Sequence, residues 1–172
     1  MSNAVAAILT EFREEVPAIR RVLERVPQDK LGWKPHPKSR SLGELAIHVA
    51  NIPGLIENIA TKNEFAPTGQ ATPPGSADEI RNTFEKNARA AEAALGNLSD
   101  EAAQESWRLV FQGKEILRRT RLQALRTNVL NHIYHHRGQL SVYLRLLEVP
   151  VPIVYGPTAD ENPFLQQATK SA

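Results

Sequence analysis

The chain has 172 residues, of which 41% are hydrophobic and 23% are charged, and this balance fits one globular domain with a core rather than a disordered chain. It contains no cysteine, which excludes disulfides, thiolate metal ligands and a cysteine nucleophile. A formal net charge of +2 is too small to indicate a nucleic-acid partner, and no apolar run approaches the ~20 residues that span a bilayer. We expect a single cytoplasmic domain over residues 1–172 that does not enter the membrane.

The first half of the chain predicts two helical segments separated by a loop. Apolar residues recur at three- and four-residue steps over residues 8–26, which is typical of an amphipathic helix, and Pro17 is expected to bend or interrupt it. Prolines at positions 35 and 37 predict a loop. Ser41 stands three residues before Glu44, the spacing of a capping box, so a second helix should start there and run to about Ile59, with Pro53 as a bend.

The second half predicts two further helices and an irregular end. After a long loop over residues 66–75, Ser76 and Glu79 repeat the capping-box spacing, and the third helix should end near Gly96. Residues 107–114 predict a short extended turn. The longest helix should run from about Thr120 to Glu148, and the tail from about residue 149 reads as irregular structure. Four amphipathic helices without a convincing series of strands predict an all-α fold, a four-helix bundle.

Three histidines fall on the predicted apolar faces. An ideal helix turns about 100° per residue, and on that count His136 lies in the middle of the apolar stripe of the fourth helix and His132 at its edge. His48 lies within the apolar face of the second helix, whereas His135 is about 100° away from the stripe centre. Three imidazoles would then point into one core.

The spacing of these histidines indicates a metal site, although a satisfied core histidine is the ordinary reading of any one of them. Two imidazoles four residues apart on one helix face converge on one point, as in zinc-binding helices. His48 can join them if the second and fourth helices are neighbours. An all-nitrogen set suits a divalent transition metal: zinc or nickel is favoured, and iron, manganese and copper remain open.

The sequence resembles the DinB-like superfamily of metalloenzymes over about residues 5–162. The resemblance is carried by residues 26–35, by Ser39–Glu44 leading to His48, by the run His132-Ile133-Tyr134-His135-His136-Arg137-Gly138-Gln139, and by Pro152 with Tyr155-Gly156-Pro157. It implies a bundle of up-down-down-up order, often a homodimer, with metal ligands that fall on His48, His132 and His136. It also implies relatives that include S-transferases and isomerases using small thiols such as bacillithiol or mycothiol.

Several other residues are candidates for supporting roles. Asn128 and Gln139 lie near the histidines along the fourth helix and could orient their rings. Arg137 could bind an anionic substrate or an acidic side chain, and Trp33 could stack on a substrate or pack over the bundle end. Asp160 and Glu161 could pair with Arg137 or His135. The basic residues Arg118, Arg119 and Arg121 are expected to form a solvated surface rather than a nucleic-acid site.

These features support two main hypotheses and a weaker third. The first is a metal-dependent transferase or hydrolase acting on a small-molecule substrate, with a low-molecular-weight thiol as one candidate. The second is a non-catalytic bundle that binds a metal or another ligand. The third, nucleic-acid association through the basic residues, has the least support.

Overall fold

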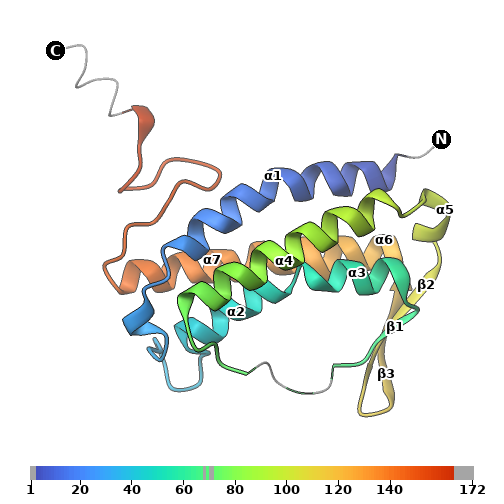
Figure 1. The fold of residues 1–172 in the computed structure, drawn as a ribbon, viewed down its shortest axis with the longest axis horizontal. Helices are drawn as coiled ribbons and strands as arrows, with labels where there is room; N and C mark the ends of the chain where they lie inside the picture. Colours follow the sequence, from blue (N-terminus) through green and yellow to red (C-terminus); the bar gives the residue numbers. More distant parts are fainter. Residues whose placement is uncertain (1–2, 68, 70–71, 165–172) are drawn as a thin grey trace.

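The computed structural model describes residues 3–67, 69 and 72–164, and Figure 1 shows its elements. The helices are α1 (Ala4–Glu24), α2 (Leu42–Asn51), α3 (Gly54–Thr61), α4 (Ala77–Gly96), α5 (Asp100–Ala103), α6 (Arg121–Ala124) and α7 (Asn131–Leu146), with a 3₁₀ turn η1 (Gln28–Lys30) and a π-helical segment η2 (Leu125–Leu130). The strands are β1 (Glu64–Phe65), β2 (Ser106–Phe111) and β3 (Lys114–Thr120). The protein is therefore mainly helical, as predicted, with a small three-stranded sheet that the all-α prediction did not include.

Helix α1 forms as its apolar spacing predicts. Its buried side chains recur at helical steps on one face (Val5, Ile8, Phe12, Val16, Ile19, Val22 and Leu23). The expected interruption at Pro17 is absent, because α1 continues through this residue, which lies on the exposed side of the helix.

Two helices stand where one was predicted between residues 42 and 61. The capping box at the start of α2 is confirmed: Ser41 Oγ accepts from the Glu44 amide at 3.1 Å, and a Glu44 carboxylate oxygen accepts from the Ser41 amide at 2.6 Å. Proline has no amide hydrogen to donate, and α2 ends at Asn51, two residues before Pro53, with α3 starting at Gly54. The helix axis can therefore change direction at this junction, which borders the site described below.

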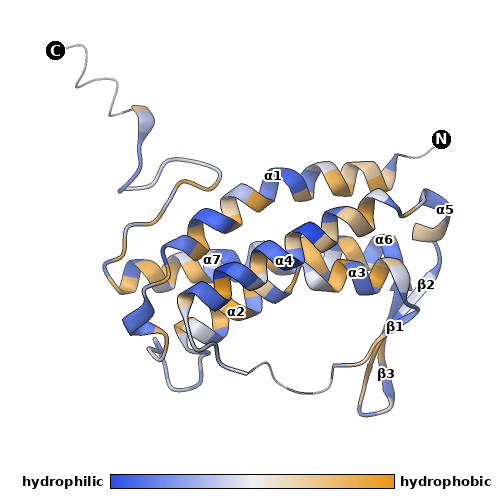
Figure 2. Ribbon diagram, in the orientation of Figure 1, coloured by the Kyte–Doolittle hydropathy of each residue, from blue (hydrophilic) through white to orange (hydrophobic). Residues whose placement is uncertain are grey.

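The core lies where α1, α2, α4 and α7 face one another. Helix α4 packs against α1, α2 and α3, and α7 packs against α1 and α2. In Figure 1, α4 lies at the front of the molecule. Hydrophobic residues line the inward sides of these helices in Figure 2, and Phe12, Phe84 and Ile80 are fully buried among them. The second and fourth predicted helices are therefore neighbours, as a shared histidine site requires. No helix in the described residues is long and apolar enough to cross a bilayer.

The sheet sits at one end of the helices and has the order β1-β2-β3. Strand β1 pairs in parallel with β2, and β2 pairs antiparallel with β3, with a bulge between Leu109 and Val110. Gln112 and Gly113 both have positive φ values, 49° and 74°, the conformation of the tight turns that join hairpin strands. Trp107 on β2 is fully buried and donates from Nε1 to Asn58 Oδ1 at 3.1 Å, which ties the sheet to α3.

The last helical stretch starts at Thr120, as predicted, but it is not one regular helix. Thr120 caps α6, then η2 makes π-helical turns before α7 begins at Asn131. Such π segments are uncommon and occur frequently at functional sites. A π-helix turns less per residue than an α-helix, so residues before Asn131 do not keep the angular phase of those after it.

The tail is irregular from residue 149 to 162, as predicted, but it is anchored. The Asp160 carboxylate accepts from Arg145 and from the Val151 amide, and Glu161 pairs with Arg21 and Arg25. Arg137 and His135, the predicted partners of these two acids, are therefore not the partners found here.

Candidate metal centre

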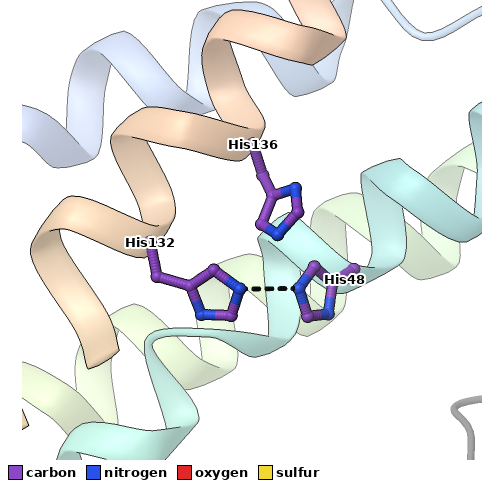
Figure 3. Close-up of side chains that lie close together, drawn as sticks. All are labelled: His48, His132 and His136. Carbon is purple, nitrogen blue, oxygen red and sulfur yellow. Dashed lines mark hydrogen bonds between the residues drawn. The ribbon is translucent and has the colours of Figure 1, made fainter. Parts of the chain in front are cut away.

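Three imidazole rings meet between α2 and α7 (Figure 3). His48 Nε2 and His132 Nε2 lie 3.1 Å apart, and the candidate ligand nitrogens of His48, His132 and His136 all lie within 4.8 Å of one another. Ligand nitrogens of a tetrahedral ion with bonds of about 2.0–2.1 Å are separated by about 3.3 Å. The cluster thus has the composition and nearly the spacing of a three-histidine metal site.

Two elements supply the three rings. His132 and His136 are one turn apart on α7, and His48 comes from the facing turn of α2. All three side chains are half-buried. The fully buried face of α7 carries Ile133, Arg137, Leu140 and Leu144, so His136 lies at the edge of that face and not in its middle. The angular prediction assumed one regular α-helix, and the π segment before Asn131 breaks that phase.

The hydrogen bonds of the ring Nδ1 atoms leave the Nε2 atoms available on α7. His136 Nδ1 lies 2.7 Å from Gln139 Oε1, and His132 Nδ1 lies 3.3 Å from the Asn128 carbonyl oxygen. Because both partners are oxygens that can only accept, both rings carry their proton on Nδ1 and present an Nε2 lone pair. A hydrogen bond to the second ring nitrogen is the usual way in which proteins orient a metal-ligating histidine.

The environment keeps the imidazoles neutral. Burial, together with the positive charge of Arg40 and the neighbouring rings, lowers the pKa of His48 to about 3. Burial is also the main cause that lowers the pKa values of His132 and His136, and Arg40 contributes to both. A neutral imidazole is the form that binds a metal ion, and the lowered pKa values favour this form of all three rings.

Two of the remaining candidate residues contact the histidine cluster. Gln139 contacts His136 through its side chain, and Asn128 contacts His132 through its backbone carbonyl. His135 is exposed, although its ring lies edge-on to that of His136 at 4.8 Å between centroids. Trp33 packs edge-on against Tyr143.

Arg137 points away from the imidazoles toward α1. It is 3% exposed, forms an ion pair with Glu15, and places its guanidinium over the ring of Tyr155. Of the two partners predicted for Arg137, the structure shows an acidic side chain. No pattern in the sequence indicated that this side chain would be Glu15.

The basic residues Arg118, Arg119 and Arg121, at the junction of β3 and α6, do not form one solvated surface. Arg118 pairs with Glu115 on the same strand, and Arg119 donates to Thr127. Arg121 is buried and donates to the carbonyl oxygens of Ile59 and Lys62. Arg121 therefore joins α3 to α6 inside the protein and is not available to a nucleic acid.

A pocket of about 370 Å³ adjoins the imidazoles, within the size range of small-molecule sites. Its lining is His48, Asn51, Ile52, Gly54, Leu55, Phe65 and His132. Two of the three rings thus open onto a mainly apolar space at the α2–α3 junction. Asn51 and Phe65 were missed at the sequence level. Asn51 follows His48 by three residues and so shares its helix face, a signal that could have been used, whereas Phe65 reaches the pocket through tertiary structure alone.

Comparisons with known proteins agree with this fold. The sequence profile described as the DinB family matches residues 1–167. The uncharacterized protein YrdA of Bacillus subtilis strain 168 is 27% identical over 162 residues, covering 94% of this chain and 93% of that protein.

Two solved structures are similar in fold. A DinB-like protein from Bacillus cereus ATCC 10987 has a TM-score of 0.68 and 27% identity, covering 86% of this chain and 95% of that one. The DinB-like protein YjoA from Bacillus subtilis has a TM-score of 0.65 and 18% identity, covering 91% and 99%. Because the family model matches nearly the whole chain, the chain belongs to the DinB family.

Proposed function

We propose that this protein is a metal-dependent enzyme in which His48, His132 and His136 hold one divalent transition metal ion. The observation that carries the proposal is the convergence of these three half-buried imidazoles next to an apolar pocket. Two of the rings already present unprotonated Nε2 atoms toward the third. Each buried polar nitrogen that lacks a partner costs about 1–3 kcal/mol, and a shared ion satisfies several of them together.

The donor set bears on which ion is held. Three neutral nitrogens fit zinc or nickel best, with iron, manganese and copper as further candidates, and they do not fit magnesium or calcium, which prefer oxygen. Three protein ligands leave a coordination position free, the arrangement of catalytic rather than structural zinc sites. When bound, such an ion polarises a coordinated group and makes a coordinated water or thiol more acidic.

The pocket indicates what the protein residues contribute. Leu55, Ile52 and Phe65 can hold the apolar body of a small substrate and keep water from it, while Gln139 and the Asn128 carbonyl keep the two α7 rings in place. Transfer of a low-molecular-weight thiol and hydrolysis of a small ester or amide are the reactions that we propose to test.

One observation favours a second candidate, a non-catalytic protein that binds a metal or another ligand. The described residues that line the pocket include no carboxylate that could act as a general base. Catalytic and non-catalytic roles therefore have to be separated by experiment.

The test is a turnover screen of metal-free protein reloaded with zinc, nickel, manganese, iron or copper. Thiol transfer to small electrophiles and hydrolysis of esters and amides would be assayed with the wild type, His132→Ala and His135→Ala. The enzyme hypothesis predicts turnover in the wild type and in His135→Ala and its loss in His132→Ala. Metal uptake without turnover of any substrate class would favour the non-catalytic role.

We also propose that the helices form an up-down-down-up four-helix bundle and that two chains form a homodimer in the cytoplasm. The pairwise packing of α1, α4, α2 and α7 supports the first. The exposed Val142 and Leu146, one turn apart on α7 and both more than half exposed, support the second. Sedimentation equilibrium would separate a monomer from a dimer.

A further inference from the structure

We infer that Asn51 is a substrate-binding residue, whose carboxamide donates a hydrogen bond to an oxygen atom of a small, mainly apolar ligand bound at the metal. This inference rests on the proposed metal function, and it narrows the substrate class to molecules that combine an apolar body with a carbonyl-type oxygen near the metal-binding atom.

Asn51 lies on the same side of α2 as His48. It is the last residue of the helix and stands three residues after His48, so both side chains lie on one face. Both line the pocket, together with the apolar side chains of Ile52, Leu55 and Phe65. Among the described residues that line the pocket, Asn51 is the one polar side chain apart from the two imidazoles.

The neighbouring helix orients the Asn51 carboxamide. Asn87 on α4 donates from Nδ2 to the Ala50 carbonyl oxygen at 3.0 Å, and the same nitrogen lies 3.5 Å from Asn51 Oδ1. Since Asn87 Nδ2 can only donate, Asn51 Oδ1 is the acceptor. Asn51 Nδ2, with two hydrogens, is then left without a partner among the described residues.

The packing around Asn87 is tight enough to hold this arrangement. A side chain on Gly54, the first residue of α3, would place its Cβ 3.3 Å from the Asn87 carboxamide. The glycine therefore lets α3 begin directly against Asn87. Asn87 acts as a positioning residue, while Asn51 faces the ligand.

A free amide donor beside an apolar pocket selects the ligand chemistry. A ligand oxygen within reach would satisfy the donor, whereas a purely hydrocarbon ligand would remove water from it without replacing the lost hydrogen bond. Sites that hydrogen-bond a polar ligand group discriminate most strongly against analogues that lack it. A metal-bound ligand with a carbonyl-type oxygen should therefore bind better than one with the same ring and no oxygen.

The experiment compares two probes on cobalt-loaded protein. Benzohydroxamate chelates metals through its N–O oxygen and its carbonyl oxygen, and the carbonyl oxygen keeps a second lone pair that can accept from Asn51, whereas thiophenolate has the same ring and binds through sulfur with no oxygen at all. Their dissociation constants would be measured from the visible absorption of bound cobalt in the wild type, Asn51→Leu, Asn51→Ala and the control Asn97→Leu. Asn97 is the exposed residue that caps the C-terminus of α4, and its side chain donates to the Ala93 carbonyl oxygen.

The inference predicts that both Asn51 variants keep full cobalt content and bind benzohydroxamate about tenfold more weakly, the effect of one lost hydrogen bond. Thiophenolate affinity should stay within about twofold of the wild type, and Asn97→Leu should change neither. Unchanged benzohydroxamate binding, an equal loss for both probes, or a cobalt-loaded wild type that binds neither probe would overturn the inference alone. A wild type that takes up no cobalt would instead refute the proposed metal function.

Discussion

The buried ion pair between Glu15 and Arg137 joins α1 to α7, and Glu15→Ala should destabilise the protein by about 3–5 kcal/mol, the range for leaving a buried charge without its partner. Glu15 is 8% exposed and Arg137 is 3% exposed. The second Glu15 carboxylate oxygen accepts from the Tyr155 hydroxyl at 2.8 Å, so the substitution also releases one contact to the tail.

Urea denaturation followed by tryptophan fluorescence would measure this loss. With an m-value of about 2 kcal/mol per molar urea, the midpoint should fall by roughly 1.5–2.5 M. The control is Glu85→Ala, which breaks the pair between Arg20 and Glu85 at 2.5 Å on the partly exposed surface and should cost less than about 1 kcal/mol.

Two outcomes bear directly on the reasoning. The double variant Glu15→Leu with Arg137→Met removes both charges and should be more stable than Glu15→Ala. If Glu15→Ala lost no more stability than Glu85→Ala, the argument from burial would be refuted.

Three further predictions follow from the core and from the imidazoles. Phe84 on α4 is 1% exposed, so Phe84→Ala should lower the free energy of unfolding by about 3–5 kcal/mol. A loss below about 1 kcal/mol in urea denaturation would contradict its place in the core. The stability of the metal-free protein should fall as pH drops below about 6.5, because imidazoles of the unfolded chain then take up protons while burial holds the pKa of His48 at about 3 and lowers those of His132 and His136. A urea midpoint that stays constant from pH 7 to pH 4.5 would rule this out. Gln139→Ala should weaken metal affinity about tenfold or more, because Gln139 Oε1 accepts from His136 Nδ1 at 2.7 Å, whereas Gln112→Ala in the hairpin turn should leave it unchanged in a competition titration with a chelator.

Local signals in the sequence predicted the helices well. The capping residues Ser41 and Ser76 both mark true helix starts, since each accepts from the amide three residues later. At the second site the Glu79 carboxylate accepts from the Gly75 amide instead of closing a full capping box on Ser76. Caps and apolar periodicity depend on neighbouring residues, and for this reason one sequence is enough to predict them.

The sheet could not be predicted in the same way. Strand β1 has two residues, and its partners are Arg108 and Leu109, more than forty positions away. In β2 and β3 the apolar residues Phe111 and Ile116 are exposed alongside charged residues such as Arg108 and Arg118, so apolar alternation is weak. Only the turn around Gln112 and Gly113 left a local trace, and it was read as a short extended turn.

The site was predictable in part because its three histidines lie on regular helices. Residues 132 and 136 are one turn apart on any helix, and His48 faces them once α2 packs on α7. The π segment before Asn131 shifted the predicted centre of the buried face. Arg40, Phe65 and Asn87 approach the site or its pocket only through tertiary packing, and no local pattern marks them.

Metal content per chain tests the central claim most directly. The wild type, saturated with zinc or nickel and passed through a desalting column, should retain one ion per chain by elemental analysis, and His135→Ala should retain the same amount. His48→Ala, His132→Ala and His136→Ala should each lose it while keeping their helical circular dichroism. An ion that stays bound in all three of these variants, or no bound ion in the wild type, would contradict the account.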